Sequence, residues 1–314
     1  MKGERRALKG RCRGAHRLSA TLLAAAALWC GLAAVAADVG FDVDWSRARA
    51  VSDGIDVLEL ATDTPRLMKG YLMRVDLARH GFVGTDRCRA NWGEPMPEVK
   101  DRYVPCRTER QTTADFLKEK RAAGLDVVAA INTTPWAPWD NRTFNARYAE
   151  PFGPTLAGGR IVGWQDRPSG AYFCVETNGA ARIVRHVGYA DHRRYDLVQA
   201  AFSVLLEKGA GVWHKEDLSL APRMAVGLSP DARTFYALAV DGRQPGWSLG
   251  ATMADLALTL KAAGASDALN MDGGGSTTLL YWDPAKGAPV MVNRHDPARK
   301  HVRRNAVNLG FVRR

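Results

Sequence analysis

The sequence predicts a single α+β domain over residues 38–314, with a mixed β-sheet core and a few helices. Two observations predict it. Short apolar runs bounded by turn residues recur along the chain, which is typical of strands. Two segments combine an N-cap residue, apolar residues at helical spacing and a terminal glycine, which is typical of helices. The chain is long enough to bury a full core, and neither an internal repeat nor a low-complexity tract divides it.

In the N-terminal half, strands are expected at residues 55–61 and 70–78, and the prolines of residues 84–111 predict an irregular insertion. Thr112 or Thr113 is expected to cap a helix that runs to Ala123 and stops at Gly124. A buried strand at 125–131 then leads to Asn132. Residues 133–154 are rich in proline and aromatic residues and predict a long loop, whose Trp136 and Trp139 are expected to pack rather than to stack on a sugar.

Further strands are expected at residues 160–164, 170–176, 181–185 and 198–206, with Asn178-Gly179 as a hairpin turn. Residues 224–228 and 234–240 alternate like paired strands joined by Ser229-Pro230-Asp231. Thr252 is expected to cap a helix that continues through Ala263 and stops at Gly264. A short strand at 268–271 then delivers Asp272 into a triple-glycine turn, and a strand follows at 277–282.

The first 37 residues differ from the rest and indicate a signal peptide. A basic start precedes an apolar run at 22–35 and the small residues Ala34-Val35-Ala36, which predicts cleavage near Ala36 or Ala37 and a periplasmic or secreted protein. The run is short for a bilayer span of about 20 residues, so an uncleaved membrane anchor is the less favoured alternative. Arg5-Arg6 resembles a twin-arginine export signal. Trp29 before Cys30 is too large for a lipoprotein cleavage site.

The charge of the chain depends strongly on this leader. It carries a net +6 of the total of +11, so the rest of the chain is only mildly basic. No long run of Lys and Arg interleaved with aromatic residues remains, which argues against a nucleic-acid partner. A modest positive charge suits a phosphate-bearing substrate.

Three cysteines remain after the leader. Cys88 and Cys106 flank a loop-like stretch, and in an oxidising compartment we expect them to form a disulfide. Cys174 lies in an apolar run and is expected to be a buried strand residue rather than a nucleophile.

The segment Asp272-Gly273-Gly274-Gly275-Ser276-Thr277 is the strongest candidate for chemistry. Three glycines allow backbone N–H groups to approach a ligand and form an anion-binding concavity, to which Ser276 and Thr277 add hydroxyl donors. Asp272 beside it is a candidate catalytic carboxylate, although a tight turn in which Asp272 bonds its own backbone explains the same residues. A P-loop is excluded because the Gly-Lys-Ser/Thr ending is absent, and an EF-hand lacks its alternating acids.

Several segments in order resemble the phosphodiester glycosidase family, whose members remove a sugar from a phosphodiester and include bacterial proteins linked to exopolysaccharide. They are Arg223 to Leu228, Ala239 to Arg243, Gly250 to Ala257 and Asp267 to Leu279. Upstream, Ala129-Ala130-Ile131-Asn132 resembles a strand of the family, but Thr133-Thr134-Pro135-Trp136 follows it where the family has Gly-Gly and an aromatic pair, which leaves this part of the pocket open. The resemblance covers about residues 125–312.

The resemblance implies the following site residues. Asp272 is the key carboxylate, and Arg223 binds phosphate, since a guanidinium matches phosphate geometry. Asp241 is either the second catalytic carboxylate or part of an ordinary Asp-Gly turn. The remaining expected contacts to phosphate or sugar are Asn132, Asn270, Gly273, Gly274, Gly275, Ser276, Thr277 and Arg304, the last in a C-terminal motif of unfixed register.

The resemblance also implies the reaction, which is cleavage of the C–O bond between a sugar and a phosphodiester in a cell-surface polymer or glycan. A phosphate leaving group needs little acid assistance, which favours one carboxylate with Arg, Ser, Thr and backbone donors. A phosphodiesterase that cuts the P–O bond and a noncatalytic exopolysaccharide-binding or assembly factor are the alternatives.

No histidine pair has metal-ligand spacing, and His186, His192, His295 and His301 are expected to be solvated loop residues. No cofactor is required by any motif. Acids and carbonyls around Asp272 suit a divalent cation such as calcium, so a metal stays open.

Overall fold

The computed structural model describes residues 39–90, 106–137, 146–165, 170–213, 217–295 and 301–314. The predicted signal peptide, its cleavage site and the alternative membrane anchor lie outside these residues. Within them, no helix is long and apolar enough to cross a membrane.

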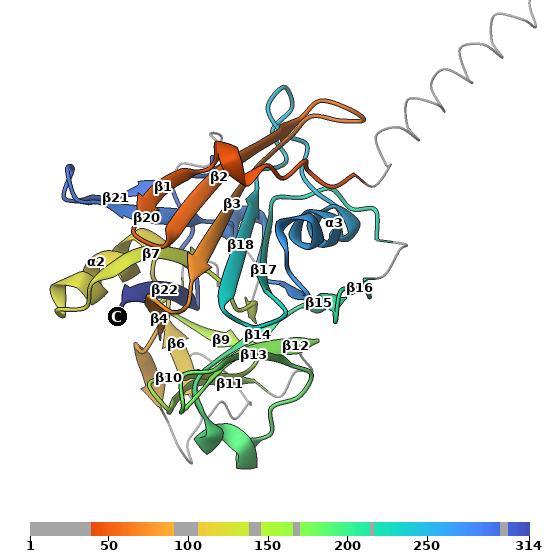
Figure 1. Cartoon of the computed structure of the whole chain (residues 1–314). Coiled ribbons are helices and arrows are strands. Elements are labelled where there is room, and N and C mark those ends of the chain that lie inside the picture. The colour runs from red at the N-terminus through yellow and green to blue at the C-terminus, as the bar shows by residue number, and fades with distance from the viewer. Residues whose placement is uncertain (1–38, 91–105, 138–145, 166–169, 214–216, 296–300) are drawn as a thin grey trace, which may run out of the picture. The chain divides into compact units, whose positions relative to one another are not determined.

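The fold is mostly β rather than α+β. The described residues contain two α-helices, α2 (Thr113–Ala122) and α3 (Met253–Ala263), and three short 3-10 segments, η1 (Trp45–Arg47), η2 (Tyr189–Arg194) and η3 (Gly274–Ser276). The rest of the regular structure is strands in four sheets (Figure 1). The prediction of a few helices was correct, but short strands also occupy the insertion and the loop that we expected to be irregular.

The largest sheet has eight strands in the order β1-β2-β3-β18-β17-β19-β15-β16. Their bounds are β1 (Arg49–Ser52), β2 (Ile55–Thr62), β3 (Met68–Asp76), β15 (Ser203–Glu207), β16 (Ala210–Gly211), β17 (Arg223–Leu228), β18 (Thr234–Val240) and β19 (Asp267–Asn270). The chain leaves β18, passes through α3 and returns as β19 on the other side of β17. This crossover places the ends of β18 and β19 beside the start of β17.

Two five-stranded sheets have the orders β11-β10-β14-β12-β13 and β21-β20-β7-β22-β4. The strands of the first are β10 (Gly153–Ala157), β11 (Arg160–Gln165), β12 (Ala171–Glu176), β13 (Ala181–Val184) and β14 (Tyr195–Ala201). Those of the second are β4 (His80–Gly84), β7 (Val127–Asn132), β20 (Leu279–Asp283), β21 (Ala288–Met291) and β22 (Asn308–Arg313). The fourth sheet, β5-β6-β9-β8, contains β5 (Cys88–Ala90), β6 (Cys106–Glu109), β8 (Trp136–Ala137) and β9 (Tyr148–Pro151).

Neighbouring strands pair antiparallel throughout the described residues, so the expected mixed sheet was wrong. Short turns between successive strands produce antiparallel pairs, whereas a parallel pair needs a crossover connection. The α3 crossover does make β18 and β19 run in the same direction, but β17 lies between them. The strand predicted at 198–206 is two strands, because the chain moves from one sheet to another at Phe202.

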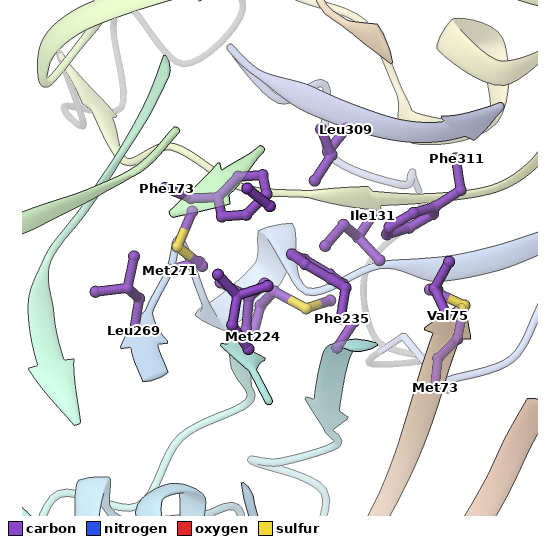
Figure 2. Packing of buried hydrophobic residues seen from close by; sticks show 14 of the residues in the cluster. Met73, Val75, Ile131, Phe173, Met224, Phe235, Leu269, Met271, Leu309 and Phe311 are labelled. Atoms are coloured by element: carbon purple, nitrogen blue, oxygen red, sulfur yellow. The ribbon is translucent and has the colours of Figure 1, made fainter. Parts of the chain in front are cut away.

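The core joins three of the sheets through a group of phenylalanines. The ring of Phe235 from β18 lies 5.1 Å from that of Phe173 on β12 and 5.3 Å from that of Phe311 on β22. Figure 2 shows these rings meeting beside Ile131 and Met271. The same core therefore holds β7 and the end of β19, the two strands that lead into Asn132 and Asp272.

Each helix covers one sheet with an apolar face. Leu256 and Leu260 of α3 pack with Leu72 and Leu238 of the eight-stranded sheet. Phe116 of α2 belongs to a separate cluster over β7 and β20. The predicted N-caps are confirmed at Thr112 and Thr252, and Gly264 ends α3 with φ of 110°. The first helix ends at Ala122 with Ala123 as its C-cap, one residue before the predicted end.

The Thr252 cap leads to a stability prediction. Its hydroxyl accepts a hydrogen bond from the N–H of Asp255, and the Asp255 carboxylate accepts one from the N–H of Thr252. Thr252→Ala is expected to lower the free energy of unfolding by about 1 kcal/mol. Urea unfolding measures the change. Thr252→Ser keeps the acceptor and is the control, so equal loss in both variants would contradict the capping explanation.

The fourth sheet contains the two cysteines expected to pair. β5 and β6 are antiparallel neighbours, with Cys88 opposite Thr108 and Ala90 opposite Cys106. The backbone thus brings the two positions close together. The side chain of Cys106 lies outside the part of the chain that is described, and the disulfide stays a prediction. Cys174 is buried on β12, and burial raises the pKa of its thiol far above the usual range, as expected for an unreactive core residue.

Candidate active site

The triple-glycine turn begins where β19 leaves the core. Met271 is 1% exposed in the core, and Asp272 follows it directly. A Cβ atom on Gly273 would lie 2.8 Å from the carbonyl oxygen of Pro222. Gly274 has a φ of 61°, in the left-handed region, and its N–H donates to the same carbonyl at 2.7 Å. Both positions therefore require glycine, and the turn is held against the start of β17.

Asn132 connects the two sides of this turn. Its Nδ2 donates to the carbonyl oxygen of Asp272 at 2.6 Å, and its Oδ1 accepts from the N–H of Thr278 at 2.9 Å. The N–H of Asp272 in turn donates to the carbonyl oxygen of Thr133 at 2.7 Å. An amide side chain, with one donor and one acceptor group, suits this position, and the strand β7 holds it in place.

The carboxyl group of Asp272 is buried and polarised. The residue is 7% exposed, and the Nε1 of Trp136 donates to its Oδ2 at 3.1 Å. Burial raises the pKa of Asp272 to about 6, while hydrogen bonds from Ser276 and Trp136 and the charge of Arg303 oppose the rise. Asp272 is therefore mostly ionised at pH 7, and it titrates close to the range in which acid–base catalysts work.

The bond from Trp136 gives a prediction about this titration. Trp136→Phe removes a hydrogen bond that lowers the pKa of Asp272, so this pKa is expected to rise, by about one unit at most. The acid limb of the pH dependence of kcat/KM measures it. Trp45→Phe is the control, because the Nε1 of Trp45 donates to the distant carbonyl of Ala263. An acid limb that stays at the wild-type position in Trp136→Phe would contradict the assignment.

Basic residues lie on the Trp136 side of the turn. The Nη1 of Arg303 donates to the Oγ of Ser276 at 3.2 Å. The guanidinium of Arg110 lies 4.6 Å from the centre of the Trp136 ring. Burial and the charges of Arg303 and Arg304 lower the pKa of Arg110 to about 10. Arg304, the residue predicted from the sequence, is exposed, and its neighbour Arg303 makes the contact to Ser276.

The other side of the turn borders a small pocket. Gly274, Gly275 and Thr277 form part of its wall. The remaining lining residues are Pro222, Asp241, Gly242, Arg243, Gln244, Asn293, Arg294 and His295. Two arginines, Arg243 and Arg294, thus line a small cavity at the triple-glycine turn.

Thr277 and Asp241 are two of the buried polar residues of this cavity wall, beside Gln244 and Asn293. Among the described residues, the Oγ1 of Thr277 has no hydrogen-bond partner, although the residue is only 3% exposed. Asp241 is 1% exposed, and burial raises the pKa of its carboxyl group. Its Oδ2 accepts from the Nε1 of Trp247 at 2.8 Å and its Oδ1 from the N–H of Arg294 at 2.9 Å. A buried hydroxyl without a protein partner suits a polar ligand.

The sequence model of the phosphodiester glycosidase family matches residues 126–312, which is more than half of the chain. The chain belongs to the phosphodiester glycosidase family. The resemblance seen in the sequence is therefore confirmed. Asn132, Trp136, Asp241 and Asp272 all lie within the matched span. Curated proteins contain no match to the chain.

Solved structures share the fold at low sequence identity. The catalytic domain of zebrafish N-acetylglucosamine-1-phosphodiester alpha-N-acetylglucosaminidase, auto-inhibited by its pro-peptide, superposes with a TM-score of 0.55 at 17% identity, over 83% of this chain and 82% of that one. A protein from Burkholderia pseudomallei described as exported gives a TM-score of 0.51 at 13% identity, over 80% and 75%. A hypothetical protein from Synechocystis gives 0.50 at 15% identity, over 85% and 63%.

Of the site residues predicted from the sequence, only Asp241, Gly274, Gly275 and Thr277 line the cavity. The predicted residues outside its lining are Asn132, Arg223, Asn270, Asp272, Gly273, Ser276 and Arg304. The guanidinium of Arg223 donates to the carbonyl oxygens of Ala251 at 3.2 Å and Ser219 at 2.9 Å, so it is used by the protein's own backbone. Asn270 is buried on β19. The phosphate contact of Arg223 and the substrate contact of Asn270 stay predictions.

The structure adds residues that sequence reasoning missed. Arg243 and Arg294 line the cavity, and Arg303 contacts Ser276. His295, expected to be a solvated loop residue, also lines the cavity, and its Nε2 lies 3.1 Å from the Oγ1 of Thr278. Two features of the sequence could have pointed to these residues, namely the Arg directly after Asp241-Gly242 and the Asn-Arg-His run at 293–295. Trp136 is 1% exposed and packs, as expected, but its N–H also binds Asp272.

Within the described ranges, no group of three or more His, Cys, Asp or Glu side chains is arranged to hold a metal ion. Activity assays with added calcium and with a chelator test whether the protein depends on this metal.

Proposed function

We propose that this member of the family is an exported hydrolase that cleaves the glycosidic C–O bond of a sugar-1-phosphodiester in a cell-surface polymer or glycan. One observation carries the proposal. A single turn bears a buried carboxylate at its start, Asp272, and forms the wall of a cavity lined by Arg243 and Arg294. A phosphodiester glycosidase needs both parts, a carboxylate for the sugar and cations for the phosphate.

The phosphate is proposed to bind at the cavity. Arg243 and Arg294 supply charge-assisted hydrogen bonds, which are stronger than neutral ones. The hydroxyl of Thr277 supplies a further donor. Burial lowers the pKa of Arg223, and the charge of nearby Arg243 lowers it further, so Arg223 adds to the positive potential of the region.

The chemistry follows from the charges. As the bond between the anomeric carbon and the phosphate oxygen breaks, its electron pair stays on the phosphate, and positive charge develops on the sugar. The cavity cations stabilise the leaving phosphate, and the ionised Asp272 stabilises the sugar cation. Water forms the new bond to the anomeric carbon and releases a proton. The products are a free sugar and a phosphomonoester.

The relatives support the substrate class and the location. The name of the zebrafish enzyme states that it acts on an N-acetylglucosamine-1-phosphodiester, and the Burkholderia protein is described as exported. The basic and apolar leader of this chain agrees with export. Attachment of the substrate to an exopolysaccharide or another surface polymer is the corresponding proposal for its natural context.

The test compares three substrates with the purified chain lacking residues 1–37. They are a sugar-1-phosphate alkyl diester, a sugar-1-phosphate monoester and an aryl glycoside, each with several sugars. Release of reducing sugar from the diester alone is the expected result. Parallel reactions with calcium and with a chelator test metal dependence. Release from the aryl glycoside at an equal rate would contradict the phosphate site.

A noncatalytic polysaccharide-binding factor is the alternative of a different class. It would show no turnover on any member of the panel, and Asp272→Asn would leave its affinity for the glycan unchanged. The buried, titrating Asp272 beside a cationic cavity favours the enzyme, because a binding site has no need of a carboxyl group whose pKa is raised.

A further inference from the structure

We infer that Asp241 is a positioning residue for Arg294, and not the second catalytic carboxylate. The inference rests on the proposed function, because it assigns roles within that site. Asp241 follows β18, and Arg294 lies beyond β21, so the two come from segments far apart in the chain. Their contacts fix one side of the cavity that is proposed to hold the phosphate.

The oxygens of Asp241 are already used by the protein. Oδ1 accepts from the N–H of Arg294 and Oδ2 from the indole of Trp247, at 2.9 and 2.8 Å. A hydrogen bond from the side chain of Asn293 also acts on this carboxyl group. These three donors fill three of the roughly four acceptor sites of a carboxylate, and the residue is 1% exposed. A nucleophile or base needs a lone pair directed at the substrate, which Asp241 largely lacks.

Arg294 is held at three points by this arrangement. Its N–H is bound by Asp241, and its carbonyl oxygen accepts from the Nε2 of Gln244 at 3.1 Å. Its guanidinium lies 4.8 Å from the centre of the Trp247 ring. Asp241 and Trp247 therefore set both the backbone and the side chain of Arg294. A cation that is fixed before the phosphate arrives binds it with less loss of entropy.

The same network reaches the glycine turn. The Nδ2 of Asn293 donates to the carbonyl oxygen of Thr277 at 3.1 Å, and its Oδ1 accepts from the N–H of Leu279 at 2.8 Å. Asp241 thus connects the loop that carries Arg294 to the turn that carries Asp272. Loss of Asp241 should displace the phosphate contact while leaving the carboxyl group of Asp272 in place.

A double-mutant cycle tests whether Asp241 acts through Arg294. The variants are Asp241→Asn, Arg294→Gln and the double variant, with Asp283→Asn as a carboxylate control outside the site. In Asp241→Asn, an amide nitrogen replaces one carboxylate oxygen, so its N–H donor faces an N–H donor of Arg294 or Trp247. KM for the diester and the Kd for inorganic phosphate are therefore expected to rise about tenfold, with kcat within about threefold of wild type. In the Arg294→Gln background, Asp241→Asn is expected to cause no further weakening of phosphate binding.

Trp247→Phe is the second variant, in case Asp241→Asn fails to fold. It removes the N–H donor to Asp241 and reduces the ring that packs against the guanidinium of Arg294. It is therefore expected to raise KM in the same direction, with the position of the acid limb unchanged. A loss of kcat of about 10³-fold in Asp241→Asn, multiplying with the effect of Arg294→Gln, would overturn the inference.

Phosphate binding separates this inference from the proposed reaction. If the wild type binds phosphate but hydrolyses no diester, and Asp241→Asn weakens binding only when Arg294 is present, the positioning role stands and the proposed reaction fails. If the wild type hydrolyses the diester and Asp241→Asn weakens phosphate binding equally with and without Arg294, the positioning role fails and the reaction stands. If the wild type neither binds phosphate nor hydrolyses the diester, both fail.

Discussion

Asp272→Asn is expected to lower kcat for a sugar-1-phosphodiester by about 10³-fold while the protein stays folded. Asn keeps the shape of the side chain and can still accept from the indole of Trp136, but it carries no charge to stabilise the sugar cation. The phosphate cavity is untouched, so the Kd for inorganic phosphate should stay at the wild-type value. Steady-state kinetics and calorimetry measure the two quantities.

The control for this variant is Asp283→Asn, which removes a carboxylate from the end of β20, outside the site. It should keep wild-type kcat. If Asp272→Asn retained more than about a tenth of the wild-type kcat, Asp272 would not be the key carboxylate, because removal of a positioned acid or base typically costs far more than that.

Activity should also fall below about pH 6, by about tenfold per pH unit. Burial raises the pKa of Asp272 to about 6, and the proposed reaction uses the ionised form. A phosphodiester substrate does not titrate in this range, so the limb belongs to the enzyme. The pH dependence of kcat/KM measures it, and the residual activity of Asp272→Asn should lack it. Activity that increases below pH 6 would show that Asp272 works as an acid.

The same titration changes stability in a defined direction. The pKa of Asp272 is about 6 in the folded protein and near its ordinary value of 3.8 when unfolded. Between these values the folded state binds more protons, so the free energy of unfolding decreases as pH rises through this window and levels off above it. The loss amounts to about 3 kcal/mol. Asp272→Asn should lack this decrease, which urea unfolding at pH 4 and pH 7 can measure.

Sequence patterns predicted the features that depend on local physics. Helix caps at Thr112 and Thr252 bond to the backbone N–H three residues away, so the starts of the two helices were predicted correctly. The glycines after Asp272 were predicted to form a close-fitting turn, and Gly273 and Gly274 do so against Pro222. Asn132 was expected at the site from the resemblance of Ala129-Ala130-Ile131-Asn132 to a strand of the family, and it bonds both sides of this turn.

Features that depend on distant contacts were not predicted. Strand direction is set by which sheet each strand joins, so the antiparallel pairing and the sheet change at Phe202 could not be read from apolar runs. The tandem Arg303-Arg304 left the register open, and only the structure shows that Arg303 contacts Ser276. Arg294 and His295 follow β21 in a segment with no pattern of its own, and the bond from Arg294 to Asp241 brings them to the cavity.

Hydrolysis of a sugar-1-phosphate alkyl diester in ¹⁸O-labelled water tests the central claim most directly. Cleavage of the glycosidic C–O bond places the label on the anomeric hydroxyl of the released sugar, with none in the phosphomonoester, and mass spectrometry of the two products distinguishes them. The account predicts that result, abolished by Asp272→Asn. Label in the phosphate, with sugar phosphate and alcohol as products, would move the cut to the P–O bond and contradict it.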